Sequence, residues 1–327
     1  VSVLHAAPDV SDVDIYLTAP GASLDGVTPI DAGFGDSAGP LAVDAGTYQV
    51  RISPDGSDTI VFNAEVTVRP GDDILVTAIE NTTGINESTR PVNLLVSGER
   101  ESTIVYDNNI GAEVRVVHNS ADTIPVDILV NGTEVLDAVP YPAASQYQNI
   151  AAPAGTYNVV VAADVDNSIA PIDVNVALEQ GKSYTAIAVG GLNNITDNTL
   201  ELLLTEDSRR TIATGSYLRV VHGSYAVAEE IPVDVYLTAT ADISEAMPAI
   251  TDLAYGQFTD QLLVPGADYY VTVTAAGDAS VVALAVGPLM IEAGNNYTVI
   301  ARDPGADEMG APLITATVLW DNEEEAN

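Results

Sequence analysis

The chain repeats itself three times, and this limits its possible folds more than any other feature. Its only three histidines end the same phrase, which reads Val-Ser-Val-Leu-His5, Val-Arg-Val-Val-His118 and Leu-Arg-Val-Val-His222. Three further landmarks follow each histidine in the same order: a Val-Asp pair, a tyrosine shortly after a glycine, and a second glycine-led strand start. The period is about one third of the 327 residues, which is the size of a domain with its own core rather than of a solenoid repeat.

Between the landmarks the pattern is that of short strands and turns. Tyr157, Val159 and Val161 alternate with Asn158 and Val160, a period of two. Runs rich in Val, Ile, Thr and Tyr are separated by Pro-Gly, Asn-Gly and Asp-Gly turns, and no helical apolar stripe persists. The sequence therefore predicts an all-β protein of three tandem antiparallel β-sandwiches, immunoglobulin-like or transthyretin-like. The predicted domains are residues 1–110, 111–214 and 215–327, the last with an acidic C-terminal tail.

Charge and composition exclude several classes of function. Acidic residues outnumber basic ones by 47 to 10, giving a net charge of −37, which repels nucleic acid. The absence of cysteine excludes disulfides, thiolate zinc sites and iron–sulfur clusters. No apolar run of about 18 residues is present, so we expect no transmembrane segment. Lys182 is the only lysine, and so acidic a composition is typical either of halophile proteins or of acidic marine or periplasmic surfaces.

The landmarks also carry a family resemblance. The phrases Val-Arg-Val-Val-His118-x-Ser, Pro-Val-Asp127, Ala-Gly-Thr-Tyr157 and Gly-Lys-Ser-Tyr184-Thr-Ala-Ile-Ala-Val-Gly resemble the secreted prokaryotic domain of unknown function 4397 (DUF4397). Repeat one departs from the pattern at Ile74, where a tyrosine is expected. The resemblance implies export and tandem β domains at the cell surface, and it implies no reaction.

The histidines are the sharpest chemical feature. Strand parity places Val116 and His118 on one face and Arg115 and Val117 on the other, so each histidine should lie at the rim of a sandwich core. We expect structural histidines bonded to a loop carbonyl or carboxylate. Zinc or iron would need two or three ligands, whereas each repeat offers one histidine besides carboxylates. The landmark tyrosines are expected to form tyrosine corners, with the hydroxyl bonded to backbone; they are Tyr48, Tyr157 and Tyr269.

No catalytic residue is assigned. Gly-Asp-Ser37-Ala-Gly-Pro matches the Gly-x-Ser-x-Gly nucleophile pattern, but that elbow requires a strand before it and a helix after it. The flanks here predict a loop, and the other repeats lack the serine. Since no nucleophile–base pair recurs with the domains, we expect no enzymatic activity.

Carboxylates and asparagines supply the remaining candidate sites. The landmark aspartates Asp14, Asp127 and Asp234 are expected to be solvated carboxylates at strand starts. No cofactor is expected, and calcium is the one candidate metal, although no EF-hand loop is present. Its candidate ligands are Asp9, Asp12, Asp14, Asp303, Asp307 and Glu308. Sequons for N-glycosylation occur at Asn81, Asn86, Asn131, Asn194 and Asn296.

The two ends of the chain suggest how copies could meet. The sequence opens with a strand pattern at Val1, so we expect an exported protein whose signal peptide has been removed. Repeat one then lacks the residues that precede the other two histidine phrases, which predicts an exposed strand edge. Val1 and Val3 at that edge and Trp320 near the other end are the candidate assembly contacts.

The sequence thus favours an extracellular or cell-surface protein without enzymatic activity. We expect a structural or interaction protein, the subunit of a filament or rod assembled head to tail from copies of itself. The alternative is a secreted or surface-anchored adhesion module that binds glycan, calcium or other cell-surface proteins.

Stability should rise with salt. Folding gathers a charge of −37 into a small volume, and about 1 M salt shortens the Debye length to about 3 Å, which screens the repulsion. Melting curves in dilute buffer and in about 2–3 M salt should show a higher melting temperature in the concentrated salt. An unchanged or lower melting temperature there would remove the halophile interpretation.

Overall fold

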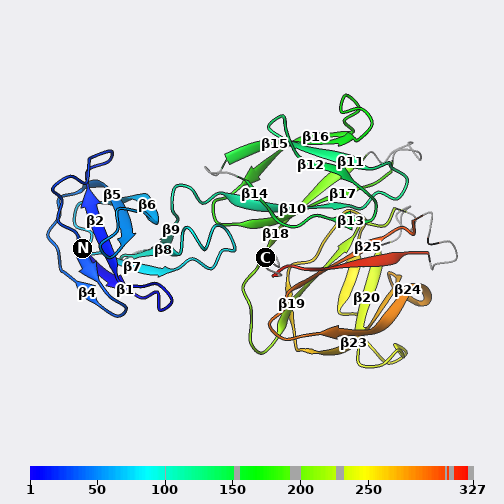
Figure 1. Cartoon of the computed structure of the whole chain (residues 1–327). Coiled ribbons are helices and arrows are strands. Elements are labelled where there is room, and N and C mark those ends of the chain that lie inside the picture. Colours follow the sequence, from blue (N-terminus) through cyan, green and yellow to red (C-terminus); the bar gives the residue numbers. More distant parts are fainter. Residues whose placement is uncertain are drawn as a thin grey trace. The chain divides into compact units, whose positions relative to one another are not determined.

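The computed structural model describes residues 1–99, 101–150, 155–191, 200–225, 232–305, 308 and 313–322. Within these residues the regular elements are 26 β-strands in six sheets, two sheets for each repeat (Figure 1). A helix long and apolar enough to cross a bilayer is absent from the part of the chain described. The predicted all-β fold of three tandem sandwiches is confirmed.

Repeat one packs a five-stranded sheet, in the order β4-β1-β7-β8-β9, on a four-stranded sheet, in the order β3-β2-β5-β6. Its strands are β1 (Ser2–His5), β2 (Val13–Thr18), β3 (Ile30–Ala32), β4 (Ser37–Ala38), β5 (Gly46–Pro54), β6 (Phe62–Val68), β7 (Leu75–Glu80), β8 (Val92–Ser97) and β9 (Ser102–Val105). Strand β6 shows why the sequence folds this way, because Phe62, Ala64 and Val66 are buried in the core while Glu65 and Thr67 are exposed.

Repeat two has the same plan. One sheet has the order β13-β10-β17-β18, with β14 also paired to β10, and the other has the order β12-β11-β15-β16. The strands are β10 (Ala112–His118), β11 (Val126–Val130), β12 (Thr133–Val139), β13 (Ala143–Ala144), β14 (Gln148–Ile150), β15 (Gly155–Ala163), β16 (Ile172–Leu178), β17 (Ser183–Val189) and β18 (Glu201–Asp207).

Repeat three pairs a sheet in the order β22-β19-β25-β26 with one in the order β21-β20-β23-β24. Its strands are β19 (Ser216–His222), β20 (Val233–Thr238), β21 (Ile250–Leu253), β22 (Leu262–Val264), β23 (Ala267–Ala275), β24 (Asp278–Ile291), β25 (Tyr297–Arg302) and β26 (Thr315–Trp320). The histidine phrase thus forms the first strand of every repeat.

That first strand is the one departure from antiparallel pairing. β1 runs parallel to β7 and β19 runs parallel to β25, whereas the other pairs whose register is described are antiparallel. The chain leaves the first strand for the opposite sheet and returns to this sheet in the original direction. Because β4 flanks β1 on its other side, the histidine strand lies inside its sheet.

The chain divides into two compact units. One contains repeat one, Val1–Glu113, with two short segments of repeat two, and the other contains the rest of repeat two together with repeat three. Repeats two and three are joined by one buried apolar cluster, to which Val117 and Ile187 contribute from repeat two and Val221 and Ile300 from repeat three. The boundaries predicted at residues 110 and 214 stay predictions.

Limited proteolysis should give different results at the connection between repeats one and two and at the connection between repeats two and three. Asn108 and Ala213 are exposed at the two joints, so we expect first cuts near residues 108–112 and 212–216. The first cut should release repeat one as a fragment of about 11 kDa, a third of the 34.0 kDa chain. After the second cut, repeats two and three should still elute together in size-exclusion chromatography under native conditions, because a buried apolar cluster joins them. A first cut inside one of the glycine–tyrosine strands would contradict the domain organisation.

Candidate functional site

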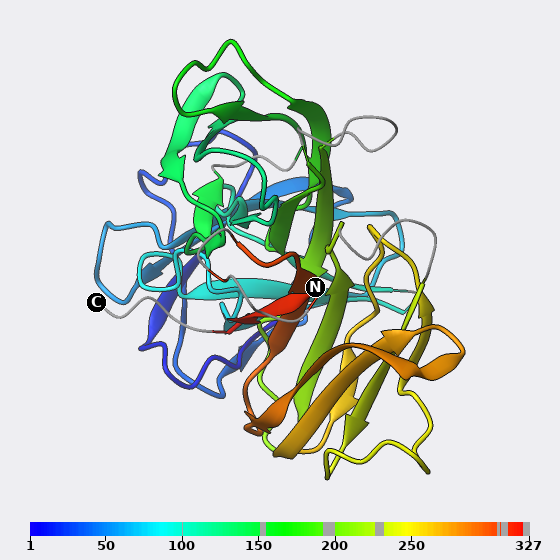
Figure 2. The same ribbon diagram turned by 90° about the vertical axis from the view of Figure 1, so that its right-hand side faces the viewer.

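A group of buried polar and charged residues lies between the facing sheets of repeats two and three. Strands β10 and β17 meet β19 and β25 there (Figures 1 and 2). Val117 belongs to this inter-repeat cluster, whereas its neighbour Val116 points into the core of its own repeat. The histidine strand of repeat two is therefore buried on both of its faces, as is that of repeat three, where Val220 and Val221 divide in the same way.

Two ion pairs cross this interface. Arg115 of β10 donates from Nη2 to Oδ1 of Asp321, the residue after β26, at 2.6 Å. Arg219 of β19 donates from Nη1 to Oδ1 of Asp207, the last residue of β18, at 2.5 Å. Both arginine side chains are about 5% exposed and both aspartate side chains are fully buried. Each repeat therefore supplies one buried cation and one buried anion, and each charge is compensated by the other repeat.

The two ion pairs are related by pseudo-two-fold symmetry between repeats two and three. Arg115 and Arg219 hold equivalent places in the histidine phrase, and each also donates to the carbonyl before its aspartate, that of Trp320 or Glu206. Within its own repeat, Asp207 accepts from Thr185 at 2.5 Å; Asp321 accepts from the equivalent Thr298 at 2.9 Å. Equivalent residues thus exchange equivalent contacts, which is the pattern of an isologous interface.

Further polar contacts surround the ion pairs. Tyr147 donates to Asp207 at 2.9 Å and its ring lies 4.7 Å from the Arg115 guanidinium carbon; burial raises the pKa of its hydroxyl. Asn119 donates from Nδ2 to the Gly223 carbonyl across the interface at 2.9 Å. These contacts compensate the buried charges from several directions, as buried ions require, although Nε of Arg219 has no hydrogen-bond partner in the described structure. The arrangement holds two domains together. Arg115 and Tyr147 also line an open pocket of about 280 Å³ beside Trp320.

Sequence reasoning missed this interface. It placed Arg115 and Val117 on the face away from the core and assigned that face no partner. A usable signal was present, because the phrases of repeats two and three carry β-branched residues on both strand faces, as strands buried on both sides do. Repeat one differs at this position, with Ser2 where the others have arginine.

The histidines are buried and less than 2% exposed. Nε2 of His118 donates to the Ile124 carbonyl at 3.3 Å, while Nδ1 accepts from the backbone N–H of Ser120 at 3.3 Å. His5 makes the same two bonds, to the Ser11 carbonyl and from the Ala7 N–H. Since one nitrogen of each ring donates to a backbone carbonyl and the other accepts from a backbone N–H, neither ring has a nitrogen free to bind a metal.

Burial also lowers the pKa of two of these rings, that of His118 and, to about 4, that of His222. Each histidine ring meets an aromatic ring edge to face, with centroids 5.8–6.5 Å apart; the partners are Phe34, Tyr141 and Tyr255. The three rings thus have equivalent aromatic neighbours, but their hydrogen bonding differs. Both ring nitrogens of His222 are buried without a hydrogen-bond partner in the described structure, so the expected bond to a loop carbonyl or carboxylate is not seen there.

The landmark aspartates are not solvated, and that expectation is wrong. Asp14, Asp127 and Asp234 are 3–7% exposed. Each accepts backbone N–H groups from neighbouring segments, as Asp234 does from Asp252 at 3.0 Å and from Gly277 at 2.9 Å. They satisfy backbone donors where strands end, which is why an acidic residue is tolerated inside.

The expected calcium ligands are placed differently from the prediction. Glu308 pairs with Arg302 at 2.7 Å, and this hydrogen-bonded guanidinium lowers the pKa of Glu308 to about 2. Asp303 accepts from Ser224 and from the Tyr225 N–H, whereas Asp307 lies outside the described residues. Asp9 and Asp12 are exposed.

One carboxylate trio is close enough to share a cation. Among the described residues, Asp127, Asp137 and Asp164 each have an oxygen within 4.8 Å of the others. Three carboxylates supply hard oxygen ligands, though calcium prefers six to eight. Only the landmark Asp127 could have been singled out from the sequence, because the other two are brought to it by β12 and the turn after β15.

Two of the predicted glycosylation sites are wrong. Asn81 and Asn296 are buried, and the Nδ2 atom that would carry the glycan donates to backbone carbonyls, those of Ile85 and Arg90 for Asn81 and of Ser208 and Arg210 for Asn296. Asn86 and Asn131 are exposed, and Asn194 lies outside the described residues.

The landmark tyrosines lie at the strand starts. Tyr48 donates to the Asp44 carbonyl at 2.7 Å and Tyr269 to that of Pro265 at 3.1 Å, each four residues upstream, which is tyrosine-corner geometry. Tyr157 is half-buried at the start of β15.

The candidate assembly contacts are used within the chain. Val1 and Val3 pack against the core of repeat one, and β1 lies between β4 and β7, so the expectation of an exposed strand edge is wrong. Trp320 is 47% exposed and packs on Tyr297, and its carbonyl accepts from Arg115. The end of β26 therefore joins repeat three to repeat two.

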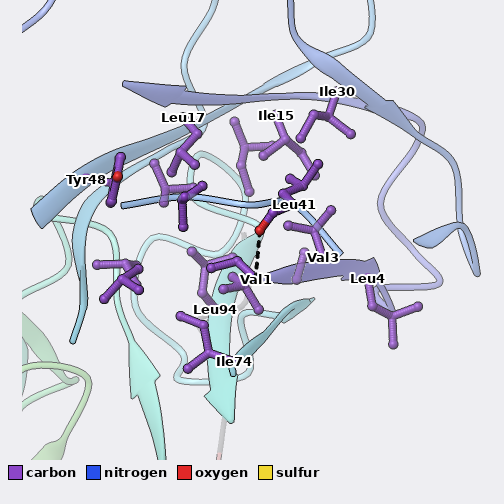
Figure 3. A pocket seen from close by; sticks show the side chains of 17 residues that line it. Val1, Val3, Leu4, Ile15, Leu17, Ile30, Leu41, Tyr48, Ile74 and Leu94 are labelled. Atoms are coloured by element: carbon purple, nitrogen blue, oxygen red, sulfur yellow. Dashed lines mark hydrogen bonds between the residues drawn. The ribbon is translucent and has the colours of Figure 1, made fainter. Parts of the chain in front are cut away.

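A small cavity lies inside repeat one (Figure 3). It measures about 40 Å³, and side chains of Val1, Val3, Ile15, Leu17 and Leu41 point into or border it. A cavity lined by hydrocarbon stays dry and offers no acid, base or nucleophile. Ser37 offers no nucleophile elbow either, because it lies exposed in the two-residue strand β4 rather than in the predicted loop.

Comparison with known proteins identifies the repeats. The sequence model of the domain of unknown function DUF4397 matches residues 1–101, 112–236 and 216–327. No curated protein matches the chain. Among solved structures, a "putative cell adhesion protein" from Bacteroides fragilis is 10% identical, with a TM-score of 0.19, over 62% of this chain and 86% of its own. A likeness this distant supports no statement about function.

Removing one partner of a crossed ion pair should be costly. Arg219→Met leaves Asp207 buried without its guanidinium, which should lower the free energy of unfolding by about 3–5 kcal/mol. The control is Arg69→Met at the Arg69–Glu101 pair, whose side chains are 65% and 66% exposed; it should cost less than about 1 kcal/mol. Chemical denaturation measures both. Equal losses for the two variants would contradict the inter-repeat role.

Acid should weaken repeat three through His222. Its folded-state pKa of about 4 lies below the ordinary value of 6.5, so between these pH values only the unfolded chain takes up the proton. Stability is therefore full above pH 6.5 and falls as pH drops towards 4, by roughly 3 kcal/mol from this ring. His222→Gln should flatten that part of the stability-against-pH curve, and parallel curves for the two proteins would refute the assignment.

Proposed function

The chain belongs to the DUF4397 family over almost its whole length, and on this premise we propose that it is an extracellular interaction protein of the adhesion type, without enzymatic activity. Its three sandwiches bind other molecules through their exposed faces and loops. The crossed ion pairs between repeats two and three carry the proposal, because these buried charges hold two domains together.

The distribution of reactive groups supports a binding role. A catalytic site needs a nucleophile or base poised at a cavity. In the described residues, Arg115, Arg219, Asp207 and Asp321 neutralise one another, and the ring nitrogens of His5 and His118 are occupied by backbone groups. Among these residues the ring nitrogens of His222 have no hydrogen-bond partner, but the ring is buried. The enclosed cavity in repeat one is lined by hydrocarbon, and a second pocket there, of about 300 Å³, is lined by Arg69, Asp72 and other charged residues without a histidine.

The surface chemistry supports an external location. A charge of −37 is tolerated in concentrated salt, where screening weakens the repulsion between like charges within and between chains. A chain without cysteine gains nothing from an oxidising compartment, so its rigidity has to come from packing, and the joint between repeats two and three supplies it. The head-to-tail filament is a weaker proposal, since Val1, Val3 and Trp320 already have partners within the chain.

Surface exposure and adhesion test the proposal together. Protease added to intact cells that make the protein should digest it, while a cytoplasmic marker survives. Beads coated with the folded chain should bind such cells more than beads coated with the same chain after thermal unfolding. Protection from protease until the cells are lysed, or equal binding by both kinds of bead, would overturn it. Chelation of divalent cations during the assay decides whether the Asp127 trio contributes.

A further inference from the structure

We propose that the outer face of the first sheet of repeat one is a self-association surface, which pairs with the same face of a second copy of this chain. This outer face is the side of β1, β7, β8 and β9 that points away from the core of repeat one; Leu75 and Ile104 on it are exposed, whereas Thr77 is buried. Its main residues are Leu4, Leu75, Thr77, Ile79, Leu95 and Ile104. The inference goes a step beyond the proposed function, because it names one partner and one surface.

The register assigns these residues to the outer side. Along β7 and β8 the core takes Val76, Ala78 and Leu94, so the alternate positions, Leu75 and Leu95 among them, point the other way. Ile104 of β9 pairs with Leu95 and therefore shares its side. Leu75 is 37% exposed and Ile104 is 44% exposed.

The same face is buried in the other two repeats. Parallel pairing sets Leu4 beside Thr77 in repeat one, and Val221 beside Ile300 in repeat three. The histidine phrase makes Leu4 equivalent to Val117 and Val221, and these two residues lie together in the buried inter-repeat cluster. This chain therefore shows directly how such a face is covered: by an equivalent face, about a pseudo-two-fold axis.

Because the chain has three repeats and two of them cover each other's outer faces, the outer face of the third has no equivalent face to pack against. Repeats two and three satisfy each other, and repeat one presents the third equivalent surface. The outward positions of its four strands hold no charged residue, although 17% of the chain is charged and the net charge is −37. Half of these positions are Leu or Ile and the others are Ser, Thr or Asn. An uncharged sheet face with this apolar content, on so acidic a protein, resembles an interface more than a solvated surface.

The identity of the covering partner follows from residue type. Ser2 stands where the other repeats have arginine, so this face offers no buried ion to a charged partner. A second copy brings the same neutral face, and neither copy then buries an unpaired charge. The contact should be apolar and should tighten with salt, since salt screens the repulsion between two acidic chains.

Sedimentation of the full chain tests the proposal. In about 2–3 M salt the wild type should form dimers at micromolar concentrations. Leu75→Asp places one new charge on each side of the contact and should weaken dimerisation by about 100-fold or more. The matched control is Val165→Asp, an equally charged change at a residue that is 75% exposed in repeat two, which should leave the dimer intact.

Crosslinking locates the contact independently. Because the chain has no cysteine, Leu4→Cys introduces a single thiol, and a short bismaleimide should link two copies through it. Val165→Cys should not crosslink under the same conditions.

Several results would overturn the inference. A wild type that stays monomeric at about 100 µM in concentrated salt would do so, as would a dimer that Leu75→Asp leaves intact. If the chain is monomeric and Leu75→Asp abolishes bead adhesion, the face binds a different molecule. Sedimentation uses purified protein without cells, so its failure is distinct from a failure of the proposed adhesion.

Discussion

The crossed pairing of Arg115 with Asp321 and of Arg219 with Asp207 is the constraint on which the unit of repeats two and three depends. A buried charge without its counter-ion is strongly destabilising, and here each counter-ion comes from the other repeat. The two sandwiches consequently have one satisfactory arrangement, in which both pairs close together. The apolar cluster supplies contact area, while the ion pairs restrict the orientation in which that area can be buried.

The same strand position explains why repeat one behaves differently. With Ser2 in place of arginine and Leu75 in place of Thr185 or Thr298, its outer face has neither the cation nor the hydroxyl that orients the aspartate. Its fold is nevertheless that of the other repeats, because the core residues of β1 and β7 point to the opposite side of the sheet. The inward-facing residues of such a strand thus stabilise the fold of its own repeat, while its outward-facing residues determine what the sheet associates with.

Most of the misplaced predictions share one cause. The sequence predicts solvated carboxylates at Asp14, Asp127 and Asp234 and glycans at Asn81 and Asn296, because polar residues are usually exposed. In the structure the aspartates accept hydrogen bonds from backbone N–H groups, and the asparagines donate hydrogen bonds to backbone carbonyls. These backbone groups would otherwise be buried without a partner. Identifying such a role requires knowing which loop closes over the side chain. The strand pattern does not contain that information.

The sequence by itself determined the threefold repeat, the sandwich fold and the inward side of each strand. These follow from motif recurrence and from a period of two residues, both of which are local properties of the chain. Only the tertiary structure decided which outward faces are buried, because the partner of Arg115 lies 206 residues away on another repeat. The alternation along the strand shows that the side chains of Arg115 and Val117 point away from the core of their own repeat, but it does not show which residues they contact. That depends on the packing of one folded sheet against another.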